Sequence, residues 1–342
     1  MKFLISVILL SLCSASFAKD SKVINFLVAH RPHDKDHVEL IQKFAKNIES
    51  RTQGRLKVQL HFKHIDEKED LFKISPFLVF SGQFQMSQIP IDRMSEFVNT
   101  IDVLDFPMVF RDHAHAQEVL DGDIGRELMA NMESDTFNKM KALAYTYSGG
   151  WRHIYTNAKE FNSLSDLSGE RMRFRGSRSA NDLFALLGVN LNFMSQKEFI
   201  EMHSAKGKYF EEAETNRIML YRYFNPEMIK TVQTVIESKH SLYLTVLAMN
   251  GDFFRKLSVA DQSLVVEETQ SLAREERKLS IKQEIDGKKI LEKQGVRFIS
   301  LSEKDREVLQ ENASKIYQKY GPTHMSLIQR IKAIKDSKLV TH

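Results

Sequence analysis

Two arginine residues lie among apolar neighbours in the middle of the chain. Arg152 follows the only tryptophan and precedes an apolar alternating run that includes Ile154, and Arg173 lies between Met172 and Phe174. An arginine rarely enters apolar surroundings unless it is paired, and its planar guanidinium group matches a carboxylate with two parallel hydrogen bonds. Two such residues in neighbouring segments indicate a pocket for an organic anion. The alternative, in which each arginine pairs with a carboxylate of the chain itself, remains open at this point.

The N-terminus has the pattern of a secretory signal. Lys2 supplies a positive start, an almost unbroken apolar run covers 3–12, and small residues precede a cleavage after Ala18. The apolar run is too short for a membrane span. We therefore expect an exported protein of the bacterial periplasm whose mature chain begins at Lys19. In the alternative, a lipoprotein, Cys13 would carry the lipid, although Leu12 stands where a small residue is usual.

Composition narrows the functional classes. Cys13 is the only cysteine, so a mature chain cleaved after Ala18 has no disulfide, thiol nucleophile, iron–sulfur cluster or cysteine zinc site. The formal net charge is +4 and basic residues are interleaved with acidic ones. Because a nucleic-acid-binding protein needs a basic stripe, we expect no nucleic-acid partner. A mature length of about 320 residues suits two domains.

Hydrophobic periodicity predicts alternating strands and helices, which indicates an α/β architecture with largely parallel sheets. Strands are expected at 22–29, 56–62, 77–80, 142–147, 153–156, 172–174, 189–191 and 242–249, and helices at 36–51, 113–132 and 179–187. Residues 261–294 contain no proline and a single glycine, Gly287. As one helix this segment would be about 50 Å long and could cross both domains; the alternative is two helices broken near Gly287.

Four segments occur in an order that resembles one protein family. They read FAKNIESRTQGRLKV at 44–58, VLDFPMVFRD at 103–112, DLSG and MRF within 166–174, and MN followed by LSVADQ within 249–262. Behind a signal sequence, this series is similar to the solute-binding proteins of tripartite ATP-independent periplasmic (TRAP) transporters. The resemblance covers nearly all of the mature chain. It implies a periplasmic binding protein fold: two α/β domains that close over an organic acid, with a ligand cleft between them and a long helix spanning both.

The resemblance also implies ligand contacts. The arginine that matches Arg173 forms the principal salt bridge with the ligand carboxylate, and the one that matches Arg152 adds a second contact. We align Glu214 with a glutamate of the family's ligand loop, which leaves Thr215 or Asn216 as a polar contact, and Asn216 is preferred. This stretch departs from the family pattern, since Glu211-Glu212 replaces the usual Asp-Gly.

The segment 30–37 concentrates three histidines and two aspartates. Imidazole and carboxylate groups are plausible zinc ligands, but the spacing matches no closed ligand set, and Asp36 can equally cap the helix that follows. We expect no metal and no cofactor. The loop after the first strand faces the cleft in folds of this type, so His30 is a further candidate ligand contact.

The expected organisation is a signal peptide at 1–18, one domain from 19–148 with 242–281, and a second from 149–241 with 282–342. The chain would cross between them near 148–150 and 239–242. The predicted function is capture of an organic anion, a carboxylate, by a monomer that delivers it to the membrane permease subunits of the transporter. The alternative is a ligand sensor on the same fold. We expect no enzymatic activity, because there is no nucleophile elbow, zinc-protease motif or phosphate loop.

Overall fold

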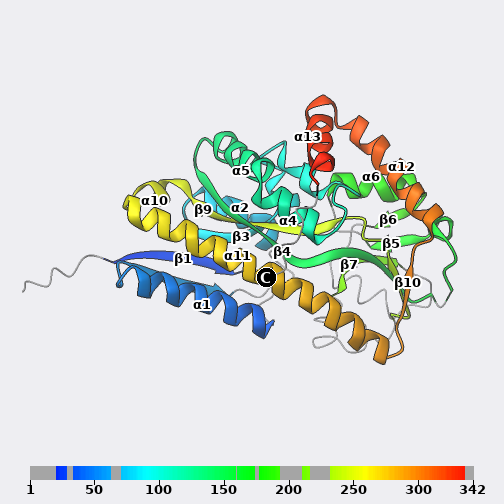
Figure 1. Cartoon of the computed structure of the whole chain (residues 1–342), viewed down its shortest axis with the longest axis horizontal. Helices are drawn as coiled ribbons and strands as arrows, with labels where there is room; N and C mark the ends of the chain where they lie inside the picture. Colours follow the sequence, from blue (N-terminus) through cyan, green and yellow to red (C-terminus); the bar gives the residue numbers. More distant parts are fainter. Residues whose placement is uncertain are drawn as a thin grey trace, which may run out of the picture.

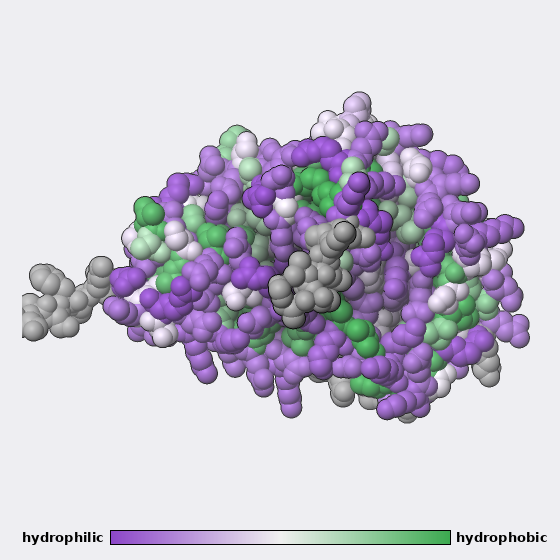
Figure 2. Space-filling model, in the orientation of Figure 1, coloured by the Kyte–Doolittle hydropathy of each residue, from purple (hydrophilic) through white to green (hydrophobic). Residues whose placement is uncertain are grey.

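A computed structural model describes residues 21–28, 34–62, 71–158, 160–173, 177–192, 210–215 and 232–335. It is a mixed α/β protein in which helices cover the faces of a long sheet (Figure 1). The predicted signal peptide at 1–18 and the predicted ligand contacts His30 and Asn216 lie outside the described residues. The face of the molecule seen in Figure 2 is predominantly hydrophilic, with small hydrophobic areas between the polar ones. Within the described ranges, no helix is both long and apolar enough to cross a membrane.

One sheet carries the whole architecture, and β4 joins its two halves. The strand order is β2-β1-β3-β9-β4-β7-β5-β6, and β8 pairs with both β4 and β10. The strands are β1 (Lys22–Val28), β2 (Leu56–Phe62), β3 (Met86–Pro90), β4 (Met140–Thr156), β5 (Arg171–Arg173), β6 (Asn190–Asn192), β7 (Phe210–Glu214), β8 (Thr234–Glu237), β9 (Leu242–Asn250) and β10 (Arg297–Ser300). We call β1, β2, β3, β9 and the start of β4 the first half, and the end of β4 with β5–β8 and β10 the second half.

The expectation of largely parallel sheets is only partly met. β1 is parallel to β2 and β3, and β5 is parallel to β6 and β7, but β9 runs antiparallel to β3 and β4, and β4 runs antiparallel to β7 and β8. The long strands β4 and β9 lie at the centre and pair with each other, so the sheet is mixed where its halves join.

The helices and 3-10 turns connect these strands. They are α1 (Lys35–Arg51), α2 (Leu71–Phe80), α3 (Ile91–Met94), η1 (Ile101–Asp105), α4 (His113–Asp121), α5 (Asp123–Asp135), η2 (Leu164–Leu167), α6 (Arg178–Leu186), α10 (Gly251–Arg255), α11 (Val259–Lys293), α12 (Glu303–Lys319) and α13 (Pro322–Ala333).

Two predicted elements are wrong. Residues 77–80, which were predicted as a strand, belong to helix α2. The prediction failed because a short apolar run has no periodicity that distinguishes a buried strand from a buried helix. The strand of this region is β3. The single helix predicted at 113–132 is two helices, α4 and α5, which meet at Gly122. A Cβ atom at Gly122 would lie 2.4 Å from the carbonyl oxygen of Glu118, so only glycine fits this junction.

Helix α11 is continuous over 35 residues, as predicted, and the alternative of a break near Gly287 is excluded. Ser258 caps its start by accepting a hydrogen bond from the Asp261 amide. The helix runs diagonally along both halves of the sheet and passes beside α1 (Figure 1). Ion pairs hold it to α1, where Arg51 contacts Glu267 and Glu268.

The core consists of three main apolar clusters. One lies between the first half of the sheet, α1 and α11. A second packs α4, α5 and α13 against the opposite face, and a third packs α6 and α12 against the second half. Helix α12 contributes to both the second and third clusters, with Tyr317 in one and Ile316 in the other. It therefore ties the two halves together at a distance from the central strands.

Candidate functional site

Strand β4 changes its hydrogen-bonding partner at an irregular segment. It pairs with β9 up to Thr146, resumes at Gly150 after a register shift, and then pairs with β7 and β8. Ser148, Gly149 and Gly150 all have positive φ angles of 43°, 155° and 87°. Glycine accepts such angles at little cost. The predicted crossing at 148–150 thus coincides with a backbone irregularity between the two halves; the predicted domain bounds themselves remain a prediction.

A buried carboxylate from α11 holds this irregular segment. Glu276 is 1% exposed and accepts hydrogen bonds from the backbone N–H of Tyr147 at 2.8 Å and of Ser148 at 3.0 Å. The hydroxyl of Ser280 donates a third at 2.9 Å. The strand cannot satisfy these amide groups through its regular ladder, so the side chain supplies the missing acceptors.

Arg152 lies just beyond the irregular segment and is 3% exposed. Its Nη1 is 3.1 Å from Oε1 of Glu212 on β7, and its guanidinium group lies over the ring of Tyr243 at 4.6 Å. Oε1 of Glu212 is also 3.2 Å from Nε2 of His240. The alternative in which this arginine pairs with a carboxylate of the chain is therefore realised for Arg152.

Glu212 was missed in the sequence analysis, which chose Glu214. In the β4–β7 register Arg152 is opposite Glu214 and Ile154 is opposite Glu212, yet the ion pair is diagonal. The sequence did carry a signal: residues 210–214 contain three glutamates. So many carboxylates in one short strand indicate that at least one of them faces a buried cation. The position of the Glu214 side chain is not described, so its predicted role is untested.

Arg173 ends strand β5 and is 4% exposed. In the sheet, β5 lies beside β7, where Arg173 is paired in register with Glu211. Arg152 and Arg173 therefore come from the two strands that flank β7. A guanidinium group loses its hydration when it is buried, so its charge must be compensated nearby.

The remaining predicted residue in the described part is Thr215. It follows β7 directly, is buried, and its hydroxyl accepts a hydrogen bond from the Tyr155 hydroxyl at 3.2 Å. Tyr155 lies on β4 three residues after Arg152. Thr215 thus lies near the arginine-bearing strand, and its predicted role as a ligand contact stays a prediction.

Two further titratable groups border this region. Asp105, at the end of η1, is 3% exposed, and burial raises its pKa to about 7, although the positive charge of Arg152 opposes the shift. His153, the neighbour of Arg152, is also buried, and burial lowers its pKa to about 4 despite the carboxylate of Glu284. Burial therefore shifts both groups toward their neutral forms.

The described part of the histidine-rich segment acts structurally. Asp34, instead of Asp36, caps α1 by accepting a hydrogen bond from the His37 amide, and Gln283 of α11 also donates to Asp34. Among the residues that the structure describes, no group of three potential ligands could hold a metal ion.

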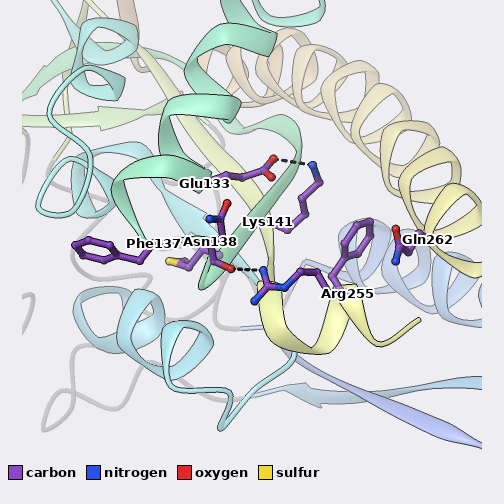
Figure 3. A pocket seen from close by; sticks show the side chains of 9 residues that line it. Glu133, Phe137, Asn138, Lys141, Arg255 and Gln262 are labelled. Carbon is purple, nitrogen blue, oxygen red and sulfur yellow. Dashed lines mark hydrogen bonds and ion pairs between the residues drawn. The ribbon is translucent and has the colours of Figure 1, made fainter. Parts of the chain in front are cut away.

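A surface pocket of about 340 Å³ lies elsewhere, between α5, β4, α10 and α11 (Figure 3). Its cations have partners: Lys141 contacts Glu133 at 2.6 Å, and Arg255 donates to the carbonyl oxygen of Asn138 at 2.7 Å. Phe137 points away from the pocket into solvent. The buried arginines on β4 and β5 are a stronger candidate for anion binding than this internally paired surface.

Comparison with known proteins identifies the family. The model of the bacterial extracellular solute-binding proteins, family 7, matches residues 28–206 and 212–323. The chain belongs to this family. It is a solute-binding protein of the TRAP type, as its sequence predicted, and the family consists of transport receptors instead of enzymes.

Individual relatives agree with this assignment. A solute-binding protein of Verminephrobacter eiseniae is 28% identical over 227 residues, which cover 66% of this chain and 64% of that protein. The 2,3-diketo-L-gulonate-binding periplasmic protein YiaO of Escherichia coli is 27% identical over 260 residues, or 75% of each chain. A crystal structure of a TRAP periplasmic solute-binding protein from Bradyrhizobium, in complex with D-galacturonate, has a TM-score of 0.77 and 26% identity, and covers 92% of this chain and 100% of that one. The predicted two-domain binding-protein fold is thereby confirmed.

Proposed function

We propose that this protein binds a sugar-derived carboxylate in the periplasm and delivers it to the membrane subunits of a TRAP transporter. The observation that carries the proposal is the pair of almost fully buried arginines, Arg152 and Arg173, on the two strands that flank β7. The ligands named for YiaO and for the Bradyrhizobium protein are both sugar acids. A carboxylate is the ligand group that a guanidinium fork binds best.

The two arginines take different roles in this proposal. Arg152, which forms an ion pair with Glu212, makes the secondary ligand contact, in line with the family resemblance. Arg173 makes the principal contact, with two parallel hydrogen bonds to the ligand carboxylate. Thr215, whose hydroxyl accepts a hydrogen bond from Tyr155, and Asn216 supply polar contacts to ligand hydroxyl groups. Glu214 and His30 are further ligand contacts in this proposal.

Export and assembly complete the proposal. The signal sequence directs the chain to the periplasm and is cleaved after Ala18, and the mature protein acts as a monomer with no nucleic-acid partner. N-terminal sequencing of the periplasmic protein should begin at Lys19. A lipid-modified Cys13 at the N-terminus would instead place the protein on a membrane.

A thermal-shift titration tests the ligand class directly. D-Galacturonate and D-galactose form a matched pair, because they differ in a carboxylate against a hydroxymethyl group. At 100 times its dissociation constant a ligand adds about 2.7 kcal/mol of stability. We expect stabilisation by D-galacturonate, D-glucuronate or 2,3-diketo-L-gulonate, and none by D-galactose. Stabilisation by succinate or malate alone would contradict the sugar-acid assignment, and stabilisation by no organic acid would contradict the proposed function.

A further inference from the structure

Asp105 lies where the two halves of the molecule meet. It is the last residue of η1, whose apolar residues belong to the cluster formed with α4, α5 and α13. Across the boundary, the hydroxyl of Ser179 in α6 donates a hydrogen bond to the Asp105 backbone oxygen at 3.3 Å. Helix α6 belongs to the apolar cluster of the second half. The Asp105 side chain is therefore close to elements of both halves.

Charged groups from several elements surround the carboxyl group of Asp105. They are Arg152 on β4, Asp92 on α3 and Glu212 on β7, and the Ser177 side chain before α6 donates a hydrogen bond. Asp92 has Arg93 at 3.7 Å, and Glu212 has His240 at 3.2 Å as well as Arg152. Three carboxyl groups thus share the neighbourhood of one buried arginine, and like charges so placed disfavour ionisation of the most deeply buried one.

One oxygen atom of this carboxyl group is unsatisfied. Oδ2 of Asp105 is fully buried and has no hydrogen-bond partner among the described residues. Buried polar atoms are almost always hydrogen-bonded, and a carboxyl group near a pKa of about 7 carries its proton in about half of the molecules at neutral pH. The group therefore offers a hydrogen-bond donor without an acceptor, within the electrostatic influence of Arg152 of the candidate site.

We propose that Asp105 is a further ligand-binding residue, which acts as a neutral carboxyl group and donates its proton in a hydrogen bond to an oxygen atom of the sugar acid. The proposal rests on the proposed function. Asp105 is not among the residues that the family resemblance assigned to the ligand. It would add a hydrogen-bond donor from η1 to a site whose arginines lie on β4 and β5.

Repulsion between like charges explains why the neutral form is the one that binds. Glu212 already forms an ion pair with Arg152, and the ligand brings a second carboxylate to this buried region. An ionised Asp105 beside that carboxylate would place like charges together in a region of low dielectric constant, which is costly. Binding of the anion therefore selects the protonated form of Asp105 and draws a proton from solvent whenever that form is depleted.

The proton stoichiometry follows from this selection. At pH 8 about one molecule in eleven has a protonated Asp105, so each binding event takes up about 0.9 proton, and the apparent dissociation constant is about tenfold weaker than at pH 6. At pH 6 the uptake falls to about 0.1 proton. Isothermal titration with D-galacturonate in buffers of different ionisation enthalpy measures this number directly.

Two variants isolate the contribution of Asp105 to proton uptake from that of other groups. Asp105→Asn keeps a donor at any pH, so we expect no proton uptake from this position and an affinity at pH 8 about tenfold tighter than that of the wild-type protein. Glu127→Gln is the control, because Glu127 forms an exposed ion pair with Arg330, and it should match the wild type. Asp105→Ser provides a second variant without the titrating group should Asp105→Asn fold poorly.

Equal proton uptake at pH 8 in the wild type and in both Asp105 variants would overturn the proposal while leaving the proposed function intact. A purely structural role would lower the unfolding temperature of the variants without changing the pH profile of affinity, and that result also contradicts it. If D-galacturonate and the other sugar acids fail to bind the wild-type protein at any pH, the proposed function and this inference both fail.

Discussion

The carboxylate of Glu276 should be the main support of the irregular segment of β4. Replacement by glutamine preserves the side-chain volume but leaves one oxygen to accept hydrogen bonds where two now accept from Tyr147, Ser148 and Ser280. A buried N–H without an acceptor costs about 1–3 kcal/mol, and hydrogen bonds to a charged group are worth about 1.5–3 kcal/mol each. Glu276→Gln should therefore lower the free energy of unfolding by about 2–4 kcal/mol.

The adjacent glutamate supplies a matched control. Glu275 is also a glutamate of helix α11, but its ion pair with Lys43 is exposed. Exposed ion pairs contribute about 0–1 kcal/mol to the free energy of unfolding. Urea unfolding of both variants measures the difference in their free energies of unfolding. This difference is read from the shift in the urea midpoint, provided that the slope of the free energy against urea concentration stays the same. Equal midpoints for Glu275→Gln and Glu276→Gln would refute the argument that this carboxylate satisfies the strand amides.

Three further predictions concern the centre of the molecule and its chemistry. Gly150→Ala should be more destabilising than Gly169→Ala in urea unfolding, and equal costs would contradict this. Both positions have positive φ, with a backbone cost of about 1–2 kcal/mol. Only a Cβ atom at Gly150 meets another residue, the carboxylate of Glu284 at 2.6 Å, which cannot move away without losing its contact with Nε2 of His113 at 3.2 Å. His153 has its pKa lowered to about 4, below its unfolded value, so its contribution to stability is present above pH 6.5 and is lost as the pH falls toward 4. His153→Gln should flatten that part of the stability profile, and an unchanged profile would show that other groups produce it. Extensive chelation should leave D-galacturonate affinity unchanged, and loss of affinity together with stoichiometric zinc in the purified protein would restore the metal-binding alternative.

The sequence predicted the elements that carry the two arginines because polar residues inside apolar runs are visible without any knowledge of pairing. It did not predict Glu212 as the partner of Arg152. The register between β4 and β7 does not decide this choice, because it places Arg152 opposite Glu214. Glu212 and Glu214 lie two residues apart on the same face of β7, and the ion pair forms with the diagonal neighbour Glu212, which depends on side-chain packing.

The fold, too, has features that can be predicted from the sequence and features that depend on packing. The long α11 was predictable because its 35 residues contain one glycine and no proline. Helix α2 was not, since its sequence is apolar at nearly every position and shows no amphipathic period. The properties of Asp105 also depend on packing: burial raises the pKa of its carboxyl group, and Arg152, Asp92 and Glu212 approach it from three other elements. His30 and Asn216 remain predictions.

The central claim is that Arg173 binds the carboxylate of the ligand. Isothermal titration of D-galacturonate against the wild type and Arg173→Ala, with thermal unfolding of the same samples, tests it most directly. Removal of one partner of a buried charge pair costs about 2–5 kcal/mol of affinity, or about 30-fold to several thousand-fold. Arg173→Lys should recover only part of the loss, because an ammonium group lacks the bidentate fork. We expect this loss with the folded state retained; near-normal affinity accompanied by a large fall in unfolding temperature would contradict the claim.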